Sequence, residues 1–281
     1  MQRKTSLIVL SRDTSDAAVT AAAEAARKQD AYLACLLLET LPARPYFMSG
    51  ATAFGSAAMP ADWVDRFAES KSAIETRAAG INGLLAQSGC SGDVQYAVSA
   101  GAEIRLLCAR RAMSCDIAGF AGGVREKDGV FREALHGLLF QSPVPVILNS
   151  APFASYSRIF LAWNSSLAAS RAAHAALPWM RRAQEVVIGC FDPDLTDERD
   201  GEDPGTDAAA WLSHHGCTVT VSQFLSGGHD VGRAIQDRAR EAGADLVVMG
   251  AYGHSRLREA VFGGTTRTMI EQTDLPVLFA H

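Results

Sequence analysis

Residues 244–281 read ADLVVMGAYGHSRLREAVFGGTTRTMIEQTDLPVLFAH, and this stretch decides the fold that we expect. An apolar run at 246–249 follows Asp245 and ends at Gly250, which is typical of a buried strand in a parallel sheet. Helical character resumes at residues 267–272, and a further apolar run follows at 276–279. The order is therefore strand, glycine loop, helix and strand, which is a unit of an α/β fold.

Glycines stand at both ends of the loop between this strand and this helix. Glycines just before a helix expose backbone N–H groups where the helix dipole is positive, and this arrangement favours an anion such as phosphate. The residues concerned are Gly250, Gly253, Gly263, Gly264, Thr265 and Thr266. Their spacing matches neither the dinucleotide-binding fingerprint nor the P-loop. The alternative to an anion site is a tight strand-to-helix connection that holds no ligand.

Strand and helix patterns alternate through the rest of the chain. We expect strands at 6–10, 31–38, 94–98, 116–120, 144–148, 158–163, 185–191 and 217–224. We expect helices at 15–28, 63–87, 103–112, 131–140, 166–177, 207–214 and 231–242. This alternation predicts an α/β fold with parallel sheets covered by helices on both faces.

The pattern begins twice, which indicates an internal duplication. Val130 and Phe131 match Val261 and Phe262 at an offset of 261 − 130 = 131, and the Pro-Val pair at 145–146 matches 276–277 at the same offset. The triplet 13–15 matches 164–166 at an offset of 164 − 13 = 151. The difference, 151 − 131 = 20, places 20 extra residues in the first half, mostly in the loop 41–62. We predict two domains, 1–150 and 156–281, joined by a short linker.

Composition limits the compartment and the partners. A chain of 281 residues with a net charge of −5 and a pI near 5.8 is long enough for two cores and lacks a broad basic surface. Nucleic acid and anionic membrane are therefore not expected as partners. The six cysteines form no CxxC pair, and we find no signal-peptide core and no apolar run near 18 residues in length. We expect a soluble, cytoplasmic protein with reduced thiols.

The spacing of three glycines resembles the Gly-x2-Gly-x9-Gly-Ser/Thr signature of the universal stress protein family, with Gly250, Gly253 and Gly263 in the glycine positions. With the repeated plan, the whole chain resembles a tandem two-domain member of that family. It departs from the signature at one position. Nucleotide-binding members usually carry Ser or Thr after the third glycine, whereas this chain has Gly264 there and Thr265 one residue later.

The resemblance implies an open, five-stranded parallel sheet in each half, a Rossmann-like fold of the adenine nucleotide alpha hydrolase-like class. It also implies a ligand crevice where the first and fourth strands part, which is where open α/β sheets in general bind ligands. In the family, an Asp at the end of the first strand helps to hold adenine, and the glycine loop holds ribose and phosphates.

The two halves keep different parts of that site. The first half retains Asp13, but Arg132 and Glu133 stand where the second half has its paired glycines, so we expect a degenerate site there. The second half keeps the glycines but has Asn164 in the Asp position. Asparagine both donates and accepts hydrogen bonds and still suits an adenine edge. Trp163 is either a core residue or part of the pocket rim.

We predict a nucleotide site in the second half for ATP or a related adenine nucleotide, with Mg²⁺ accompanying ATP. Its residues are Asn164, Ser165, Gly250, Gly253, His254, Gly263, Gly264, Thr265 and Thr266. His254 and the neighbouring Arg256 and Arg258 are equally explained as a solvated helix face.

The chain shows no Ser-His-Asp order, GxSxG elbow or HExxH motif, so we predict binding and not catalysis, with slow ATP hydrolysis left open. The hypothesis is a cytoplasmic stress-response module regulated by nucleotide. The alternatives are a nucleotide-free scaffold that acts through protein partners, and a binder of another small ligand beneath the loop 41–63. Family subunits pair through their last strands, so residues 145–148 are expected to meet 276–279 in an intramolecular pseudo-dimer. Further homodimerisation is left open.

Overall fold

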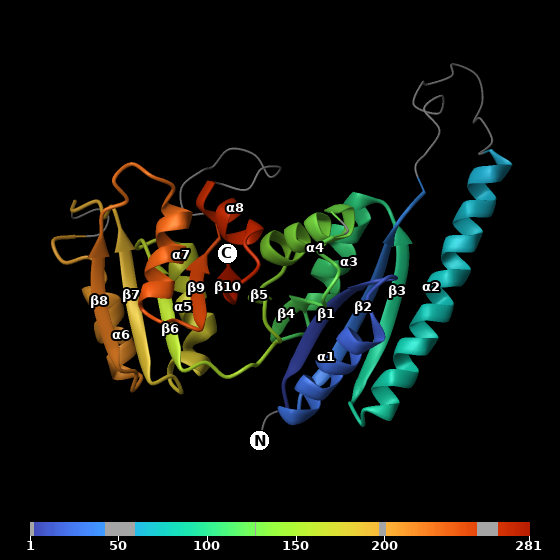
Figure 1. Cartoon of the computed structure of the whole chain (residues 1–281), viewed down its shortest axis with the longest axis horizontal. Helices are drawn as coiled ribbons and strands as arrows, with labels where there is room; N and C mark the ends of the chain where they lie inside the picture. The colour runs from blue at the N-terminus through green and yellow to red at the C-terminus, as the bar shows by residue number, and fades with distance from the viewer. Residues whose placement is uncertain (1–2, 43–59, 127, 197–200, 252–263) are drawn as a thin grey trace, which may run out of the picture. The chain divides into compact units, whose positions relative to one another are not determined.

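The computed structural model describes residues 3–42, 60–126, 128–196, 201–251 and 264–281 (Figure 1). Most of the loop 41–62 lies outside these ranges. So do three residues of the predicted nucleotide site, Gly253, His254 and Gly263.

The predicted alternation of strands and helices is confirmed. The first series is β1 (Thr5–Ser11), α1 (Asp16–Lys28), β2 (Tyr32–Thr40), α2 (Ala61–Gln87), β3 (Gly92–Ser99), α3 (Gly101–Ala112), β4 (Ile117–Phe120), α4 (Asp128–Gln141) and β5 (Val146–Leu148). The second is β6 (Arg158–Trp163), α5 (Leu167–Met180), β7 (Glu185–Phe191), α6 (Thr206–His214), β8 (Val219–Phe224), α7 (Val231–Glu241), β9 (Leu246–Gly250), α8 (Gly264–Glu271) and β10 (Val277–Ala280). Within the described residues the second series repeats the first, element for element.

The chain forms two compact units, residues 1–116 with 120–137 and residues 117–119 with 138–281. In the first unit β2 lies between β1 and β3, and all three strands are parallel. In the second unit the strand order is β4-β5-β10-β9-β6-β7-β8. Five of its six neighbouring pairs are parallel, and only the β5–β10 pair is antiparallel. The α/β fold with parallel sheets is therefore as predicted.

The predicted meeting of residues 145–148 with 276–279 is also confirmed. Leu148 pairs with Val277 and Val146 pairs with Phe279 in antiparallel register. Every residue of both strands is buried. The last strand of the first series thus contributes to the core of the second compact unit.

One aspartate in each half accepts hydrogen bonds from backbone N–H groups at the start of the first strand of that half. The Asp116 carboxylate accepts a hydrogen bond from the backbone N–H of Thr5 at 2.7 Å. The Asp245 carboxylate accepts from the N–H groups of Ser157 at 2.7 Å and Arg158 at 2.9 Å. In parallel sheets, hydrogen bonds of this kind help to set the register of neighbouring strands. The same device in both halves supports the shared plan seen in the sequence.

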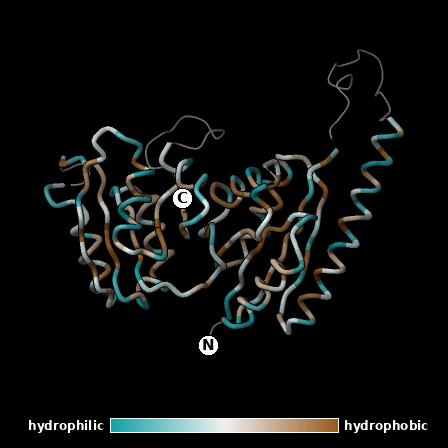
Figure 2. Tube along the Cα trace, viewed as in Figure 1, coloured by the Kyte–Doolittle hydropathy of each residue, from teal (hydrophilic) through white to brown (hydrophobic). Residues whose placement is uncertain are grey.

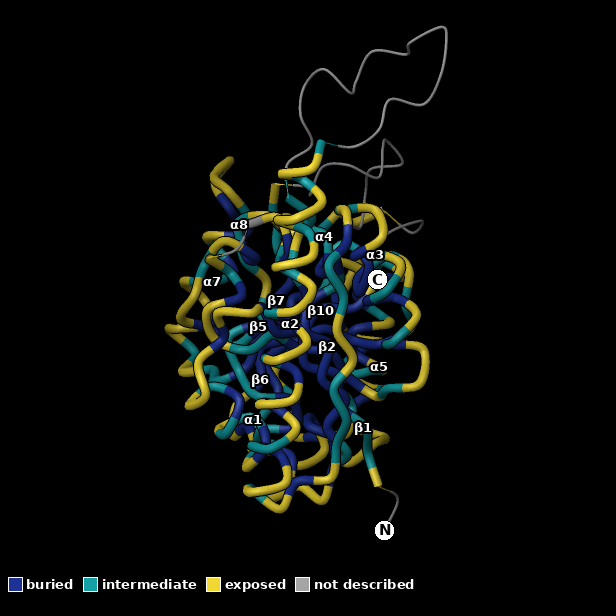
Figure 3. Tube along the Cα trace, turned by 90° about the vertical axis from the view of Figure 1, so that its right-hand side faces the viewer, coloured by how far each residue is buried: buried dark blue, intermediate teal, exposed yellow. Residues whose placement is uncertain are grey.

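Apolar strands and alanine-rich helices make the two cores. Apolar residues follow the strands, whereas apolar and polar residues alternate along α2 (Figure 2), which exposes much of its surface (Figure 3). Helix α5 buries five alanines, Ala168, Ala169, Ala172, Ala173 and Ala176. Small side chains let a helix approach a sheet closely. None of the helices in the described ranges combines the length and the apolar composition that a membrane crossing needs.

Helix α5 extends to Met180, three residues beyond its expected end at 177, although Pro178 lies inside it. Proline lacks an N–H and therefore removes one helical hydrogen bond. Burial compensates, because Trp179 is 7% exposed and Met180 is fully buried. The indole N–H of Trp179 also donates to the carbonyl of Ala154 at 3.0 Å. Tertiary contacts thus extend a helix that its own sequence would end earlier.

All six cysteines are free thiols, and five of them are buried. Burial raises the pKa of both Cys35 and Cys108 to about 12, with the neighbouring Cys90 and Asp93 adding to the effect at Cys35. These two side chains therefore stay protonated at neutral pH and act as small apolar core residues.

We predict that Asp245→Ala lowers the stability of the second unit by about 1 to 3 kcal/mol, because two backbone N–H groups lose a charged acceptor. Urea unfolding followed by circular dichroism measures the change. Asp245→Asn keeps one acceptor oxygen and should lose less. Equal unfolding midpoints for the wild type and the alanine variant would contradict this role.

Candidate functional site

The candidate site lies where the chain reverses direction across the sheet of the second half. The chain runs from β6 to β7 and β8 on one side, and returns to β9 and β10 on the other. Strands β6 and β9 are consequently neighbours, with Ile159 paired to Leu246 and Ala162 paired to Met249. Crevices at such a switch point, beyond the carboxyl ends of the strands, are the usual ligand sites of open α/β sheets.

Asn164 and Ser165 leave the carboxyl end of β6 in a tight turn. The Asn164 side-chain oxygen accepts hydrogen bonds from the Ser166 hydroxyl at 2.7 Å and from its N–H at 3.4 Å. Ser165 has a positive φ of 52°. Ser166 caps α5 by accepting from the N–H of Ala169 at 3.1 Å. Asn164 therefore shapes the start of α5, and its contact with adenine stays a prediction.

The first half uses the same cap. Ser15 caps the first helix of this half by accepting a hydrogen bond from the N–H of Ala18 at 3.2 Å. Ser15 and Ser166 are separated by 166 − 15 = 151 residues, which is the offset found in the sequence. Asp13, in the position of Asn164, is exposed.

A cavity of about 390 Å³ adjoins this turn. Its lining residues are Trp163, Ser165, Ser166, Leu167, Ser170, Gly201, Asp203, Gly205, Asp207 and Ala208. Its volume lies in the range of small-molecule sites. Trp163 is half-buried and lines the cavity wall, and its place at the rim of the nucleotide pocket stays a prediction. Ser165 is the predicted site residue that the cavity includes.

Sequence reasoning missed two acidic residues of this cavity. Asp203 and Asp207 lie in the run 192–207, which by its proline, glycine and acidic content is interpreted as a solvated loop. The fold brings the end of that run against the first turn of α5. No spacing in the sequence signals this approach, because the two segments are joined only by tertiary structure.

Gly250 has a packing role at the end of β9. A Cβ atom at this position would lie 2.5 Å from the carbonyl carbon of Ala168 and from the nitrogen of Ala169. Glycine is therefore required for α5 to rest on β9. Of the described residues in the predicted nucleotide site, Gly250 is the one whose identity the packing alone explains.

Helix α8 begins at Gly264, three residues earlier than expected. Gly264 is exposed, and a Cβ atom there would meet nothing within 4 Å. Thr265 is half-buried, whereas Thr266 is only 4% exposed and belongs to the core. Of the three, Gly264 and Thr265 thus remain accessible at the helix start, where backbone N–H groups and the dipole favour an anion.

Asp230 holds the start of α7 to α8. Its carboxylate caps α7 by accepting from the N–H of Gly232 at 2.7 Å, and also accepts from the Thr268 hydroxyl at 2.7 Å. The hydrogen bond from Thr268 is the main reason that the pKa of Asp230 lies below its ordinary value. Gly232 permits this approach, since a Cβ atom there would lie 2.8 Å from Cβ of Thr268.

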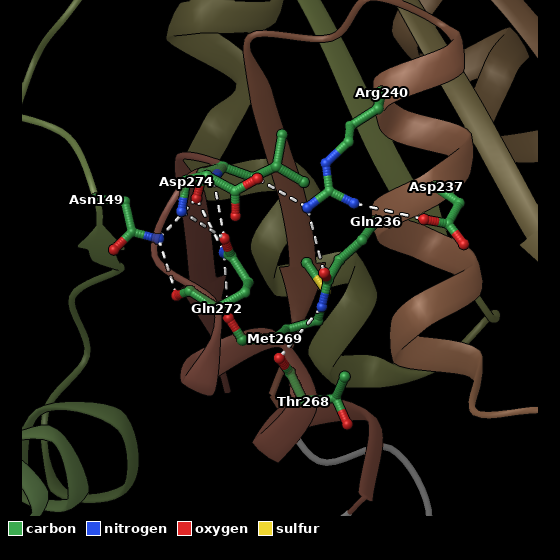
Figure 4. A network of polar contacts seen from close by, with 9 residues as sticks. Asn149, Gln236, Asp237, Arg240, Thr268, Met269, Gln272 and Asp274 are labelled. Carbon is green, nitrogen blue, oxygen red and sulfur yellow. Dashed lines mark hydrogen bonds and ion pairs between the residues drawn. The ribbon is translucent and has the colours of Figure 1, made fainter.

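A polar network continues this attachment (Figure 4). Arg240 on α7 binds Asp274 at 2.8 Å, and Gln236 donates to the Thr268 carbonyl at 3.3 Å. Beyond β5, the Asn149 amide donates to the carbonyl of Leu275 at 2.8 Å. Helix α8 and the segment that follows it are thereby held by α7 and by Asn149, all within the same compact unit.

The first half carries a carboxylate at the position that matches Gly264. Glu133 precedes it by 264 − 133 = 131 residues and forms an ion pair with Arg105. The hydrogen bond from Arg105 holds the pKa of Glu133 below its usual value, so the carboxylate is ionised at neutral pH. Its side chain also lies 3.3 Å from where a Cβ of Gly101 would be. A fixed negative charge here disfavours phosphate.

A smaller cavity of about 250 Å³ remains at the ends of β1 and β2. It is lined by Ser11, Arg12, Asp13, Leu38, Glu39, Thr40, Gly129 and Val130. The Arg12 and Glu39 side chains form an ion pair at 3.0 Å within this lining. In the part of the chain that the structure describes, no three His, Cys, Asp or Glu side chains gather closely enough to hold a metal ion.

Comparison with known proteins finds similarity to one family. Residues 156–281 match the model described as the universal stress protein family. A 34-residue stretch is 53% identical to universal stress protein Slr1230 of Synechocystis sp. and covers 12% of this chain and 12% of that protein. The aligned chain therefore spans only a small part of that relative.

Two solved structures match nearly the whole chain. One is a universal stress protein from Archaeoglobus fulgidus, with a TM-score of 0.59 at 16% identity. The match covers 98% of this chain and 97% of the chain of that protein. A putative universal stress protein from Pseudomonas aeruginosa has a TM-score of 0.55 at 15% identity, covering 99% of this chain and 93% of its own. At these identities the likeness establishes the fold.

Gly250→Ala and Gly264→Ala should have opposite effects on stability. The first forces a methyl group onto the backbone of α5 and should cost about 1 to 3 kcal/mol. The second places alanine in open space in a helical first turn and should be neutral or stabilise by up to about 1 kcal/mol. Thermal unfolding of both variants checks the difference, and a stable Gly250→Ala protein would contradict the packing role.

Thr268→Val should destabilise the protein in a pH-dependent way. Because the folded-state pKa of Asp230 is lowered, the stabilisation that its ionised form contributes is present above its unfolded pKa, about 3.9. It is lost as pH falls through the folded value. The unfolding temperature of the valine variant should thus lie below wild type at neutral pH, with a gap that narrows toward about pH 3. A gap independent of pH would refute the Thr268–Asp230 contribution.

Proposed function

We propose that this chain, whose residues 156–281 match the universal stress protein family model, is a cytoplasmic stress-response module that binds ATP or a related adenine nucleotide in its second half. One observation carries the proposal. Helix α8 begins at an exposed glycine, where a Cβ atom would meet nothing within 4 Å, and in the chain it follows β9, the neighbour of β6 at the switch point. The first half has an ionised glutamate at the matching position.

The residues present fit such a ligand. Gly264 and Thr265 offer backbone N–H groups and a hydroxyl at the amino end of α8, which suits phosphates. The cavity beside Ser165 has an aromatic wall in Trp163 and acceptor carboxylates in Asp203 and Asp207, which suit a base and ribose hydroxyls. Mg²⁺ would arrive with ATP and be held largely by its phosphate oxygens. Gly253, His254 and Gly263 complete the proposed site from sequence alone.

A nucleotide-free scaffold is the second candidate, and two observations favour it. Thr266 is buried, and the Asn164 side-chain oxygen already serves the turn before α5. Two of the predicted ligand contacts are therefore committed to the fold. In this case the chain would act through a protein partner, and ATP would leave its stability unchanged.

The repeated features support a tandem arrangement of domains 1–150 and 156–281. The matched helix caps Ser15 and Ser166 recur at the offset of 151 found in the sequence. The aspartates before β4 and β9 are 245 − 116 = 129 residues apart and make the same kind of hydrogen bond in both halves, and β5 pairs with its counterpart β10. We propose that the β5–β10 pairing makes the chain an intramolecular pseudo-dimer. Covalent connection raises the effective concentration of the two strands for each other.

Substitutions at Gly264 test nucleotide binding without disturbing the core. Wild-type protein should gain thermal stability with millimolar ATP. Gly264→Glu copies the first half and should weaken ATP binding by at least about tenfold through repulsion of the phosphates. Gly264→Gln has nearly the same size without the charge and should retain most of the affinity, whereas Gly264→Ser restores the family residue and should strengthen it.

Differential scanning fluorimetry and calorimetric titration provide the readouts. If millimolar ATP changes neither the unfolding temperature of the wild type nor the heat of titration, the proposal is wrong and the scaffold is favoured. Equal effects of the glutamate and glutamine variants would show that phosphate does not lie at Gly264.

A further inference from the structure

A second cavity lies on the second unit, where β7 and β8 end and α7 begins. Its volume is about 600 Å³, which is within the range of small-molecule sites. The lining residues are Phe191, Phe224, Leu225, Ser226, His229, Asp230, Arg233, Ala234, Asp237 and Arg238. None of the described residues of the proposed nucleotide site is among them, so we call it the edge cavity.

The floor of the edge cavity is aromatic. Phe191 and Phe224 are register partners at the ends of β7 and β8, so their side chains leave the sheet on the same face. Their rings stack with centroids 5.2 Å apart. Leu225 follows at the lip and is 85% exposed. A half-buried ring pair beside a highly exposed leucine is apolar surface that an apolar ligand would cover favourably.

The rim of the edge cavity is rigidly held. The Asp192 carboxylate accepts from the N–H of Ser226 at 2.8 Å, and its own N–H donates to the Phe224 carbonyl at 3.0 Å. The Ser226 hydroxyl accepts from the N–H of Gly228 at 3.2 Å. These hydrogen bonds already order the loop in the absence of a ligand. Binding therefore costs less conformational entropy, which favours affinity.

The charges in the edge cavity leave one guanidinium for a ligand. Asp230 is occupied by the cap and by Thr268, and Asp237 faces Arg240 at 3.4 Å. Arg238 pairs with Glu241 and lies 5.3 Å above the Phe224 ring. Among the described residues no carboxylate oxygen lies within 4 Å of the Arg233 guanidinium, although its positive charge, after the hydrogen bond from Thr268, helps to lower the pKa of Asp230. Arg233 is exposed and lines the cavity. Arginine binds a carboxylate through two parallel hydrogen bonds.

We propose that the edge cavity binds a planar aromatic carboxylate, with the ring on the Phe191–Phe224 floor and the carboxylate on Arg233. The edge cavity shares no described lining residue with the proposed nucleotide site. One carboxylate matches the single available guanidinium, and a second would face Asp230 and Asp237. The planar ring matches the stacked phenylalanines, since offset aromatic stacking adds to the gain from burial.

Calorimetric titration of the full chain with indole-3-carboxylate tests the proposal. We expect measurable binding at millimolar concentration, with indole-3-carboxamide and cyclohexanecarboxylate each binding several-fold more weakly. Arg233→Met should weaken the carboxylate by about tenfold, or about 1.4 kcal/mol. The control Arg171→Met removes the same charge from an exposed site on α5 and should leave affinity unchanged. Leu225→Ser, at a side chain that contributes little to the core, should weaken binding several-fold.

Absence of binding, equal affinity for the acid and the amide, or equal loss in the two arginine variants overturns the proposal. Equal affinity for the cyclohexane acid overturns the aromatic part of it. Displacement by ATP together with insensitivity to Arg233→Met would place the indole in the nucleotide site and overturn the assignment to the edge cavity.

Discussion

The close contact between Gly250 and the backbone of α5 is the constraint on which the second half depends. A parallel sheet must be covered on both faces, and its strands must end in register for a crevice to form beyond them. The contact fixes the end of β9 against the first turn of α5. Asp245 fixes the other end of the same strand against β6. Both ends of the switch between β6 and β9 are thereby held by short-range contacts that tolerate little change.

The two halves share one plan and differ in chemistry at several matched positions, of which Glu133 and Gly264 are one pair. In the first half, Arg105 on α3 reaches Glu133 on α4 and forms an ion pair. In the second half, Gln236 takes the place of Arg105, since 236 − 105 = 131, and Gly264 takes the place of Glu133. In the second half, α7 and α8 are instead joined by the hydrogen bond from the Thr268 hydroxyl to the Asp230 carboxylate. With the attachment at Thr268, Gly264 stays exposed at the start of α8, and a Cβ atom there would meet nothing within 4 Å.

The same arrangement separates the proposed ligand sites. The amino end of α8 and the turn after β6 are formed by backbone groups, small side chains and a helix dipole, which suit a phosphate-bearing ligand. The edge cavity is formed by stacked rings and one guanidinium, which suit a compact aromatic acid. Asp230 contacts residues near both proposed sites. It caps α7 beside the edge cavity, and it accepts a hydrogen bond from Thr268 of α8. Its hydrogen bonds give the two sites a common support.

The periodicity of apolar residues determined the strands and the helices, because these elements depend on local pattern. The offsets of 131 and 151 determined the duplicated plan and the pairing of the segments around 146 and 277, because both follow from repetition. The glycine spacing likewise determined the family resemblance. Tertiary structure alone decided that Gly250 is needed for packing, that Thr266 is buried, and that Trp163 lines a cavity. It also brought Asp203 to the first turn of α5 and Asp230 to Thr268. Such contacts join residues far apart in the chain, and neither periodicity nor spacing carries information about which distant surfaces meet.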